Sequence, residues 1–508
     1  MKQNSMERLK GALVSDLKTR PEKGPATYER VEEVLSEVLD GEHVDTAVTL
    51  LEEGFRGIGQ KVLDARDELV DAQAEAVAGM VSSGVREGWI TDLQLEKMTA
   101  MLESAEISTQ EAIDMHEAHK IPVSKLEKDI VPVKGRGAWM MDTKGTWYLD
   151  MDSNYSAANL GLSNPEIALG LLNQASQLIT MKEDRVQIPR VRLMKAMLTI
   201  LPTGLDQFYW QNSGGEAVDK ALKIAKAYTG QKGVIAFHGC FHGRTHGAVS
   251  VTSNPEYRQP FGLLDQDWVT FLPFGDADAL EAQLEKGTEK IVIMELLQGE
   301  EGGINVPPAE YIQRVRELTK ARGAVLIADE VQTGFARTAT ADRQWWAADH
   351  FDIVPDIMVI GKSFGGGFPV TAVVTNREIG SRMKPGFDGS TFGGNPMACV
   401  AATIAIRQMK QLDLPNRVAA GAKQLTDGLK ALDHELVMDI RGLGMMVGVE
   451  LPSADHVSKL QEALKTRGIK SSLSTGPVIR LMPPLVITEE EIADLIVKFG
   501  EVLDSLAQ

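Results

Sequence analysis

Short apolar runs alternate with longer stretches of helical periodicity through the middle of the chain. These runs occupy residues 208–210, 234–237, 269–272, 291–294, 325–328, 357–360 and 370–374. A run that is apolar at every position is typical of a strand that is buried on both faces. Strands that alternate with helices predict a largely parallel, doubly wound sheet, so the fold class is α/β.

The pattern differs at both ends of the chain. Residues 1–118 carry apolar positions at three- and four-residue spacing and few Gly or Pro, which predicts a helical N-terminal extension. After about residue 135, two short strands flank a turn at 142–145, a hairpin signal. Past about residue 408 the pattern predicts helix, a strand at 445–449, and a last helix that starts at Thr488 with Glu491 as its capping box.

We therefore divide the chain into three regions. Residues 1–118 form the helical extension, and residues 191–407 form the large sheet domain. Residues 119–190 and 408–508 form the two parts of a smaller α+β domain.

Composition narrows the classes of function. The 508 residues carry a net charge of −18, which argues against a nucleic-acid partner and against an anionic membrane surface. No apolar stretch reaches the ~20 residues that span a membrane, and the N-terminus lacks the features of a signal peptide. The two cysteines, Cys240 and Cys399, give no disulfide framework and fit a reducing cytosol. We expect a cytoplasmic protein.

Two polar residues follow neighbouring apolar runs in the large domain. Asp329 comes directly after 325–328, and Lys362 comes shortly after 357–360. Ligands of open α/β sheets bind beyond the carboxyl ends of the strands, so a carboxylate and an amine placed there can face one ligand. A P-loop ATPase is a weaker interpretation, because Asp356 stands where the phosphate loop needs its first glycine. The alternative that Lys362 is an ordinary, solvent-exposed lysine stays open.

Four further stretches could carry chemistry. Asn212 to Ala217 opens a helix after a strand, so Ser213, Gly214 and Gly215 could cradle a phosphate or merely cap the helix. Three histidines recur every four residues in FHGCFHGRTHG, but the intervening glycines disfavour one helix face, and we predict no metal. The loop ELLQGEEGG could be an active-site wall or a plain connection. Arg480 lies in an apolar run, which predicts an ion pair or a carboxylate clamp.

Seven motifs together resemble one enzyme family. They are NSGGEAVDKALKIAKAYTG, FHGRT, QGEEGG, IADEVQTGFART, PDIMVIGKSFGGGFP, GSTFGGNP and VIRLMPPL, in this order over residues 120–508. The set resembles the class III, fold-type I aminotransferases that depend on pyridoxal 5′-phosphate, and most of all the 4-aminobutyrate, acetylornithine and ornithine aminotransferases. The resemblance implies a mostly parallel large domain and a smaller α+β domain. The N-terminal helical region lies outside it.

The resemblance implies a role for each motif residue around the cofactor. Lys362 matches the Schiff-base lysine that also shuttles the proton, and Asp329 matches the partner of the pyridine nitrogen. Thr391 resembles the threonine that reaches the phosphate of the partner subunit's cofactor, which implies a homodimer or a dimer of dimers. The remaining cofactor-binding residues are Ser213, Gly214 and Gly215 at the phosphate, Phe241 stacked on the ring with His242 beside it, and Gln332 near the ring hydroxyl.

The resemblance also implies how substrates bind. Arg480 matches the clamp for the α-carboxylate of glutamate or 2-oxoglutarate, Glu300 the gate that neutralises this arginine, and Arg244 the residue for a distal carboxylate. Together they imply transfer from an ω-amino acid or diamine to 2-oxoglutarate. The sequence departs from the family pattern at Leu296, Gly215 and residues 161–165. These departures concern the identity of the amine donor more than the type of reaction. The alternatives are an aminomutase or epimerase, an ω-amine:pyruvate aminotransferase, and a partner-binding role for the N-terminal helices.

Overall fold

The computed structural model describes residues 107–507 and groups them into two compact units. One unit holds Gly135–Met140 and the residues from Tyr148 onward. The other holds residues 107–134 and Met141–Trp147. Most of the predicted helical extension, residues 1–106, lies outside the described residues.

The described residues of the smaller unit include helix α6 and one tight turn. Helix α6 (Thr109–His119) begins after Ser108, whose side chain accepts a hydrogen bond from the Glu111 N–H. The turn predicted at 142–145 forms, because the Asp142 N–H donates to the Thr146 carbonyl at 3.0 Å. Strands β1 (Pro132–Arg136), β2 (Trp139–Asp142) and β3 (Trp147–Asp150) run through this part of the sequence.

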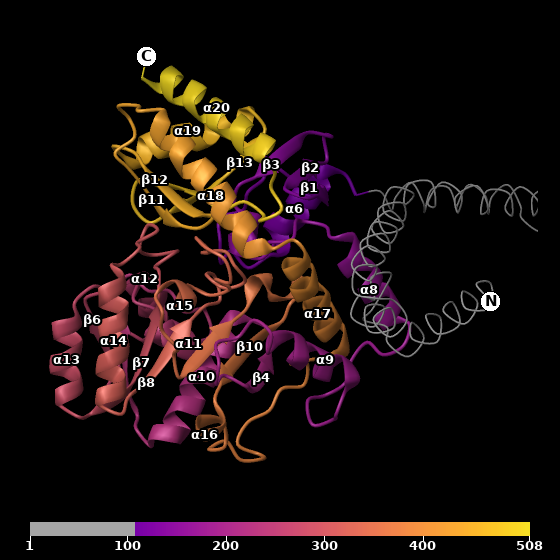
Figure 1. Cartoon of the computed structure of the whole chain (residues 1–508). Coiled ribbons are helices and arrows are strands. Elements are labelled where there is room, and N and C mark those ends of the chain that lie inside the picture. Colours follow the sequence, from indigo (N-terminus) through magenta and orange to yellow (C-terminus); the bar gives the residue numbers. More distant parts are fainter. Residues whose placement is uncertain (1–106, 508) are drawn as a thin grey trace, which may run out of the picture. The chain divides into compact units, whose positions relative to one another are not determined.

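A seven-stranded sheet dominates the larger unit, with the strand order β4-β10-β9-β8-β7-β5-β6 (Figure 1). Each strand falls on a predicted apolar run. Strands β5 to β9 are mutually parallel, whereas β10 is antiparallel to both β9 and β4. The strands are β4 (Gln207–Gln211), β5 (Gly233–Phe237), β6 (Val269–Leu272), β7 (Glu289–Glu295), β8 (Val325–Asp329), β9 (Ile357–Ile360) and β10 (Thr371–Thr375).

The antiparallel strand β10 has a simple cause. Only residues 361–370 connect β9 to β10, and they contain the short 3-10 helix η3 (Lys362–Gly365). A parallel return needs a crossover of a dozen or more residues, usually a helix. The short connection therefore turns the chain back, and it places Lys362 at the edge where the parallel strands end.

Both faces of this sheet are buried, as the uninterrupted apolar runs predict. In β5, Ile235 and Phe237 belong to one core, whereas Val234 and Ala236 belong to the other. Full burial of a side chain the size of valine, isoleucine or phenylalanine contributes about 1.5–3 kcal/mol to stability. The helices along these strands are α10 (Gly214–Thr229), α11 (His246–Val251), α12 (Pro255–Arg258), α13 (Ala277–Glu285), α14 (Ala309–Ala321), α15 (Ala347–His350) and α16 (Arg377–Gly380), with the 3-10 turn η2 (Gln259–Phe261).

The C-terminal part of the chain builds a second, antiparallel sheet with the order β11-β12-β15-β14. Helix α20 begins with the predicted capping box between Thr488 and Glu491. The sheet strands are β11 (Asp439–Leu443), β12 (Met446–Glu450), β14 (Ser472–Ser474) and β15 (Val478–Leu481), and the helices are α18 (Leu414–Ala431), α19 (Ala454–Thr466) and α20 (Glu489–Leu506) (Figure 1). The short strand β13 (Ile469–Lys470) pairs in parallel with Leu149 and Asp150 of β3.

Four more helices lie among the described residues of the larger unit. They are α7 (Ser153–Ser156), α8 (Pro165–Ala175), α9 (Ile188–Met197) and α17 (Pro396–Gln411). The alternation of strand and helix, the mostly parallel sheet and the smaller α+β part confirm the predicted fold class. Within residues 107–507, no helix has both the length and the apolar character needed to cross a membrane.

Candidate active site

A pocket of about 710 Å³ opens where the parallel strands of the large sheet end. Ten of the twelve predicted site residues line it: Ser213, Gly214, Gly215, Phe241, His242, Arg244, Glu300, Asp329, Gln332 and Lys362. Arg480 does not line the pocket but is ion-paired to Glu300, which does. Thr391 is exposed and lies outside it. The structure therefore brings ten of the predicted residues together at one cavity, with Arg480 next to it and Thr391 outside it.

Lys362 is held in an uncommon backbone conformation. It is the first residue of η3, and its φ of +50° lies in the left-handed region that non-glycine residues seldom adopt. The next residue, Ser363, donates its hydroxyl to the Ser156 carbonyl. Burial lowers the pKa of the Lys362 amine to about 8, with smaller effects from the charges of Glu300 and Arg480. With this pKa, roughly a tenth of the amine is neutral, and so nucleophilic, at pH 7.

This pKa predicts how the apoprotein reacts with an aldehyde. The rate at which it takes up pyridoxal phosphate should rise with pH as Lys362 loses its proton, and the rise should be half complete near pH 8. Stopped-flow absorbance between pH 6.5 and 10.5 measures this rate, with Lys362→Arg as the unreactive control. A half-point above pH 10 would identify an ordinary, exposed lysine.

Asp329 is the last residue of β8, and two groups hold its carboxylate. One oxygen lies 2.8 Å from Nδ1 of His242, and the other accepts the Val331 N–H at 3.1 Å. His242 is buried, and its Nε2 has no hydrogen-bond partner among the described residues. His242 and Asp329 thus form a buried, hydrogen-bonded pair on the pocket wall.

Glu295 is a second buried carboxylate at this edge, and its role was not predicted from the sequence. It ends β7, and the parallel register places it directly beside Asp329. It accepts the Phe241 N–H at 2.8 Å. Burial, and then the charge of Asp329, raise the pKa of Glu295 to about 8. The pairing of two aligned strand ends could have revealed it, but a single sequence does not give the register.

The N-terminus of α10 forms a narrow backbone wall of the pocket. Ser213 caps this helix by accepting the Glu216 N–H, and Glu216 reaches back to the Ser213 N–H. A Cβ added at Gly215 would come within 2.9 Å of the Thr245 hydroxyl. Glycine at this position therefore leaves room for Thr245, which explains one departure from the family pattern. Capping and anion binding are compatible here, because a helix N-terminus attracts negative charge.

Arg480 is a fully buried cation whose partner sits on the pocket wall. It lies in β15, and its Nη1 is 2.6 Å from a carboxylate oxygen of Glu300. Ser474 donates its hydroxyl to the Glu300 carbonyl at 2.9 Å, which fixes the backbone of that loop. Arg244, the other predicted carboxylate-binding residue, stacks on the Tyr257 ring at 3.5 Å.

The sequence profile of the family described as Aminotransferase class-III matches residues 121–503. The chain belongs to this family. It is 36% identical over 381 residues to the LysW-aminoadipate semialdehyde transaminase of Deinococcus radiodurans, covering 74% of this chain and 87% of that protein. It is also 36% identical to the acetylornithine aminotransferase of Methanothermobacter thermautotrophicus, covering 74% and 94%.

A solved structure supports the same assignment. The ornithine aminotransferase of Toxoplasma gondii, crystallised in presence of oxidised glutathione with PLP at partial occupancy in its active site, matches with a TM-score of 0.75. The two chains are 29% identical, and the match covers 80% of this chain and 97% of that one. This class III aminotransferase therefore has the fold-type I architecture, in a family that depends on pyridoxal phosphate.

A strained turn of the aminotransferase was not predicted. Ser153 to Ser156, the residues of α7, all have φ between +44° and +76°, and isolated left-handed residues cost roughly 1–2 kcal/mol each. The turn places Tyr155 on the pocket wall. Buried Arg337 donates hydrogen bonds to the Ser153 and Ser156 hydroxyls of this turn, and it also donates to Asn159, Met445 and Pro483.

We expect Arg337→Met to destabilise the apoprotein by about 2–3 kcal/mol, because the buried acceptors around it lose their donor. The urea midpoint of unfolding, followed by fluorescence, measures this. Arg343, whose side chain is 91% exposed, provides the matched control, and Arg343→Met should stay within about 0.5 kcal/mol. Equal midpoints for the two variants would show that Arg337 does not hold the turn.

Proposed function

We propose that this aminotransferase uses pyridoxal 5′-phosphate to move the amino group of an ω-amino acid or diamine to 2-oxoglutarate. The observation that carries this is the ion pair between a fully buried Arg480 and a pocket-lining Glu300. An arginine fork binds a carboxylate in two parallel hydrogen bonds, so Glu300 occupies the place that a substrate carboxylate would take.

The two members of this pair differ in freedom of movement. The Arg480 side chain is fully buried, whereas the Glu300 side chain is 32% exposed. Glu300 can therefore leave while Arg480 stays. A donor that brings no α-carboxylate leaves the pair closed, and a keto acid exchanges its own carboxylate for that of Glu300. One site thus accepts both substrates without leaving a buried charge unpaired.

The pocket fits the cofactor by the kinds of group it contains. We propose that Lys362 binds the aldehyde carbon, that Asp329 holds the proton of the ring nitrogen, and that Ser213, Gly214 and Gly215 surround the phosphate. A side chain at Gly215 would collide with Thr245, so glycine lets the N-terminus of α10 and Thr245 lie close together beside this site. Phe241, His242 and Gln332 would enclose the ring. When bound, the cofactor supplies an electron sink for the carbon that loses its amino group.

Each protein group then has a defined task in the proposed reaction. The Lys362 amine moves a proton to and from the substrate carbon, for which a pKa of about 8 is well placed. Asp329 keeps its charge next to the ring nitrogen, and His242 keeps Asp329 in position through the 2.8 Å contact.

The choice of substrates follows from charge. We propose 2-oxoglutarate over pyruvate, since Arg480 and Arg244 offer two cations for two carboxylates. The aminotransferases of Methanothermobacter and Toxoplasma are named for acetylornithine and ornithine, which supports a donor with a terminal amine.

We further propose that the enzyme is a cytoplasmic homodimer, or a dimer of dimers, in which Thr391 reaches the partner's phosphate site. Large apolar side chains are exposed on either side of Thr391 and near the start of α9: Phe387, Phe392, Val186 and Ile188. Arg190 of α9 donates to the Gly394 carbonyl and so ties the two segments together. Such a surface suits burial against a second copy, and sedimentation measures the assembly.

A donor screen tests the proposed activity. The purified holoenzyme is mixed with ornithine, acetylornithine or 4-aminobutyrate, and the visible absorbance of its cofactor is followed. We expect bleaching by a donor with a terminal amine, and recovery with 2-oxoglutarate but not pyruvate. Recovery with pyruvate alone would indicate an ω-amine:pyruvate aminotransferase. Product formation with no keto acid would indicate an aminomutase or epimerase.

A further inference from the structure

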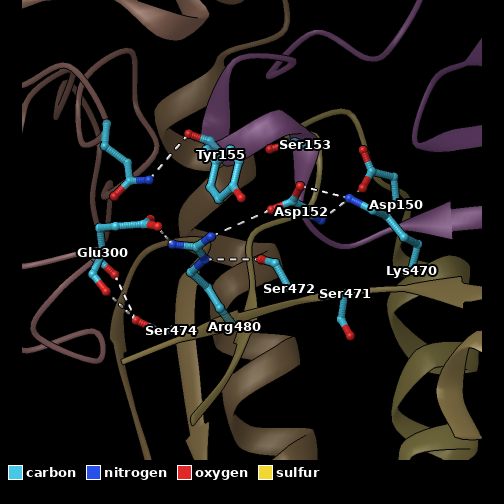
Figure 2. Close-up of polar contacts among 12 residues, drawn as sticks. Asp150, Asp152, Ser153, Tyr155, Glu300, Lys470, Ser471, Ser472, Ser474 and Arg480 are labelled. Carbon is cyan, nitrogen blue, oxygen red and sulfur yellow. Dashed lines mark hydrogen bonds and ion pairs between the residues drawn. The ribbon is translucent and has the colours of Figure 1, made fainter. Parts of the chain in front are cut away.

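Four charged side chains form an alternating row behind the pocket wall (Figure 2). Glu300 contacts Arg480 at 2.6 Å, Arg480 faces Asp152 at 3.8 Å, and Asp152 contacts Lys470 at 2.9 Å. The Arg480 and Asp152 side chains are buried, and the Lys470 side chain is 19% exposed. The row therefore runs from the pocket-lining Glu300 through Arg480 to Asp152 and Lys470, two residues with no assigned role.

The two contacts of Asp152 are unequal. Lys470 makes a hydrogen-bonded ion pair with one of its oxygens. The other oxygen faces Nη2 of Arg480, but no hydrogen bond joins them, and neither atom has another hydrogen-bond partner among the described residues. Burial opposes ionisation of Asp152, but the charge and hydrogen bond of Lys470 outweigh it, and the pKa of Asp152 is lowered. Asp152 is thus a charged neighbour of Arg480 that is hydrogen-bonded to Lys470, with Ser472 as a further hydrogen-bonding neighbour.

The backbone fixes this arrangement. Lys470 lies in β13 and is the register partner of Asp150 in β3. Asp150 accepts the Asp152 N–H at 3.0 Å, and burial raises its pKa to about 6. Lys470 is therefore the nearest cation to two carboxylates, one of which faces Arg480. Without Lys470, the carboxylates of Asp150 and Asp152 would leave excess negative charge near Arg480. This charge would repel a substrate carboxylate.

We propose that Asp152 and Lys470 are positioning residues for carboxylate binding, an inference that rests on the proposed role of Arg480. Asp152 holds the guanidinium in place when Glu300 leaves it. Lys470 neutralises Asp152, so that Arg480 remains available to the keto acid. Ser472, which accepts from Nε of Arg480 at 3.2 Å, and the Tyr155 ring, 4.9 Å from the guanidinium carbon, complete the support.

The charge of Lys470 is tested by separating the two half-reactions of the holoenzyme. Lys470→Met should raise the KM for 2-oxoglutarate about tenfold, because a like charge is left unpaired near the substrate carboxylate. The kcat and the donor half-reaction with 4-aminobutyrate, which leaves Glu300 on Arg480, should stay within about twofold. Lys470→Arg, which keeps the charge, should stay near native. Lys470→Gln replaces the methionine variant if that variant folds poorly.

A double variant separates positioning from general damage. If Lys470 acts by neutralising Asp152, then Asp152→Asn combined with Lys470→Met should bring the KM for 2-oxoglutarate back to within about threefold of native, because the amide keeps the shape and the acceptor oxygen beside Arg480 but removes the charge. A double variant as impaired as Lys470→Met alone, or an equal loss in the donor half-reaction, would overturn the proposal. The thermal midpoint and the bound-cofactor absorbance of each variant are measured alongside.

Arg480→Met distinguishes failure of this inference from failure of the proposed function. If Arg480→Met leaves the KM for 2-oxoglutarate unchanged, the proposed binding of the keto acid is wrong. If Arg480→Met raises that KM but Lys470→Met does not, the carboxylate binds at Arg480 and the positioning role is wrong.

Discussion

Replacing Lys362 by alanine is expected to slow amino transfer by about four orders of magnitude, the upper end of the range for losing a positioned acid–base group. The amine is the pocket-lining group whose pKa burial brings to about 8, and in the proposed reaction it both binds the cofactor and moves the proton. Steady-state turnover with 2-oxoglutarate and the best donor measures the loss.

The matched control for Lys362→Ala is Lys423→Ala, at a side chain that is 77% exposed on α18. This variant should turn over like the native enzyme. Cofactor content is measured for both variants, so that loss of binding is separated from loss of chemistry. Turnover of Lys362→Ala within tenfold of native would show that another group carries the proton.

Asp329→Asn is expected to lower turnover by about a thousandfold. The amide has the shape of the carboxylate and can still accept the Val331 N–H, but it lacks the charge that we propose for the ring nitrogen. Loss of the Asp329 charge should also lower the pKa of Glu295, because that charge causes part of its rise. Turnover and cofactor affinity are measured together, since the mechanism predicts that kcat falls further than binding.

An exposed aspartate serves as the control for this second prediction. Asp342, whose side chain is 62% exposed, can be changed to asparagine with no expected effect on turnover. Native-like turnover of Asp329→Asn would mean that the ring nitrogen needs no anion, and the proposed role of Asp329 would fail.

Much of the sheet and of the pocket at its edge was predictable because both depend on local sequence. Buried parallel strands are continuous apolar runs, so β6 and β9 fell at their predicted residues. Asp329 and Lys362 follow two such runs, and the geometry of α/β sheets brings strand ends together. The sequence predicted an ion pair or a carboxylate clamp for Arg480. In the structure Arg480 forms an ion pair with Glu300.

The residues that the sequence did not reveal depend on contacts between distant segments. The position of Glu295 beside Asp329 follows from the register of β7 against β8. The position of Lys470 beside Asp150 follows from the pairing of β13 with β3. The turn at Ser153 to Ser156 contains no glycine, so local propensity argues against it. It persists because Arg337, far along the chain, holds it by hydrogen bonds. Tertiary contacts decide its conformation, and a single sequence does not display them.

The left-handed turn also limits how this enzyme can acquire new substrates. Tyr155 has a φ of +57° and lines the pocket, so a change of its side chain alters both the cavity and the local backbone energy. Asparagine, aspartate and glycine suit that conformation, whereas valine, isoleucine and threonine do not. A laboratory selection for altered donors should therefore be enriched at position 155 for unbranched and small polar residues, even where a branched side chain would fill the cavity better.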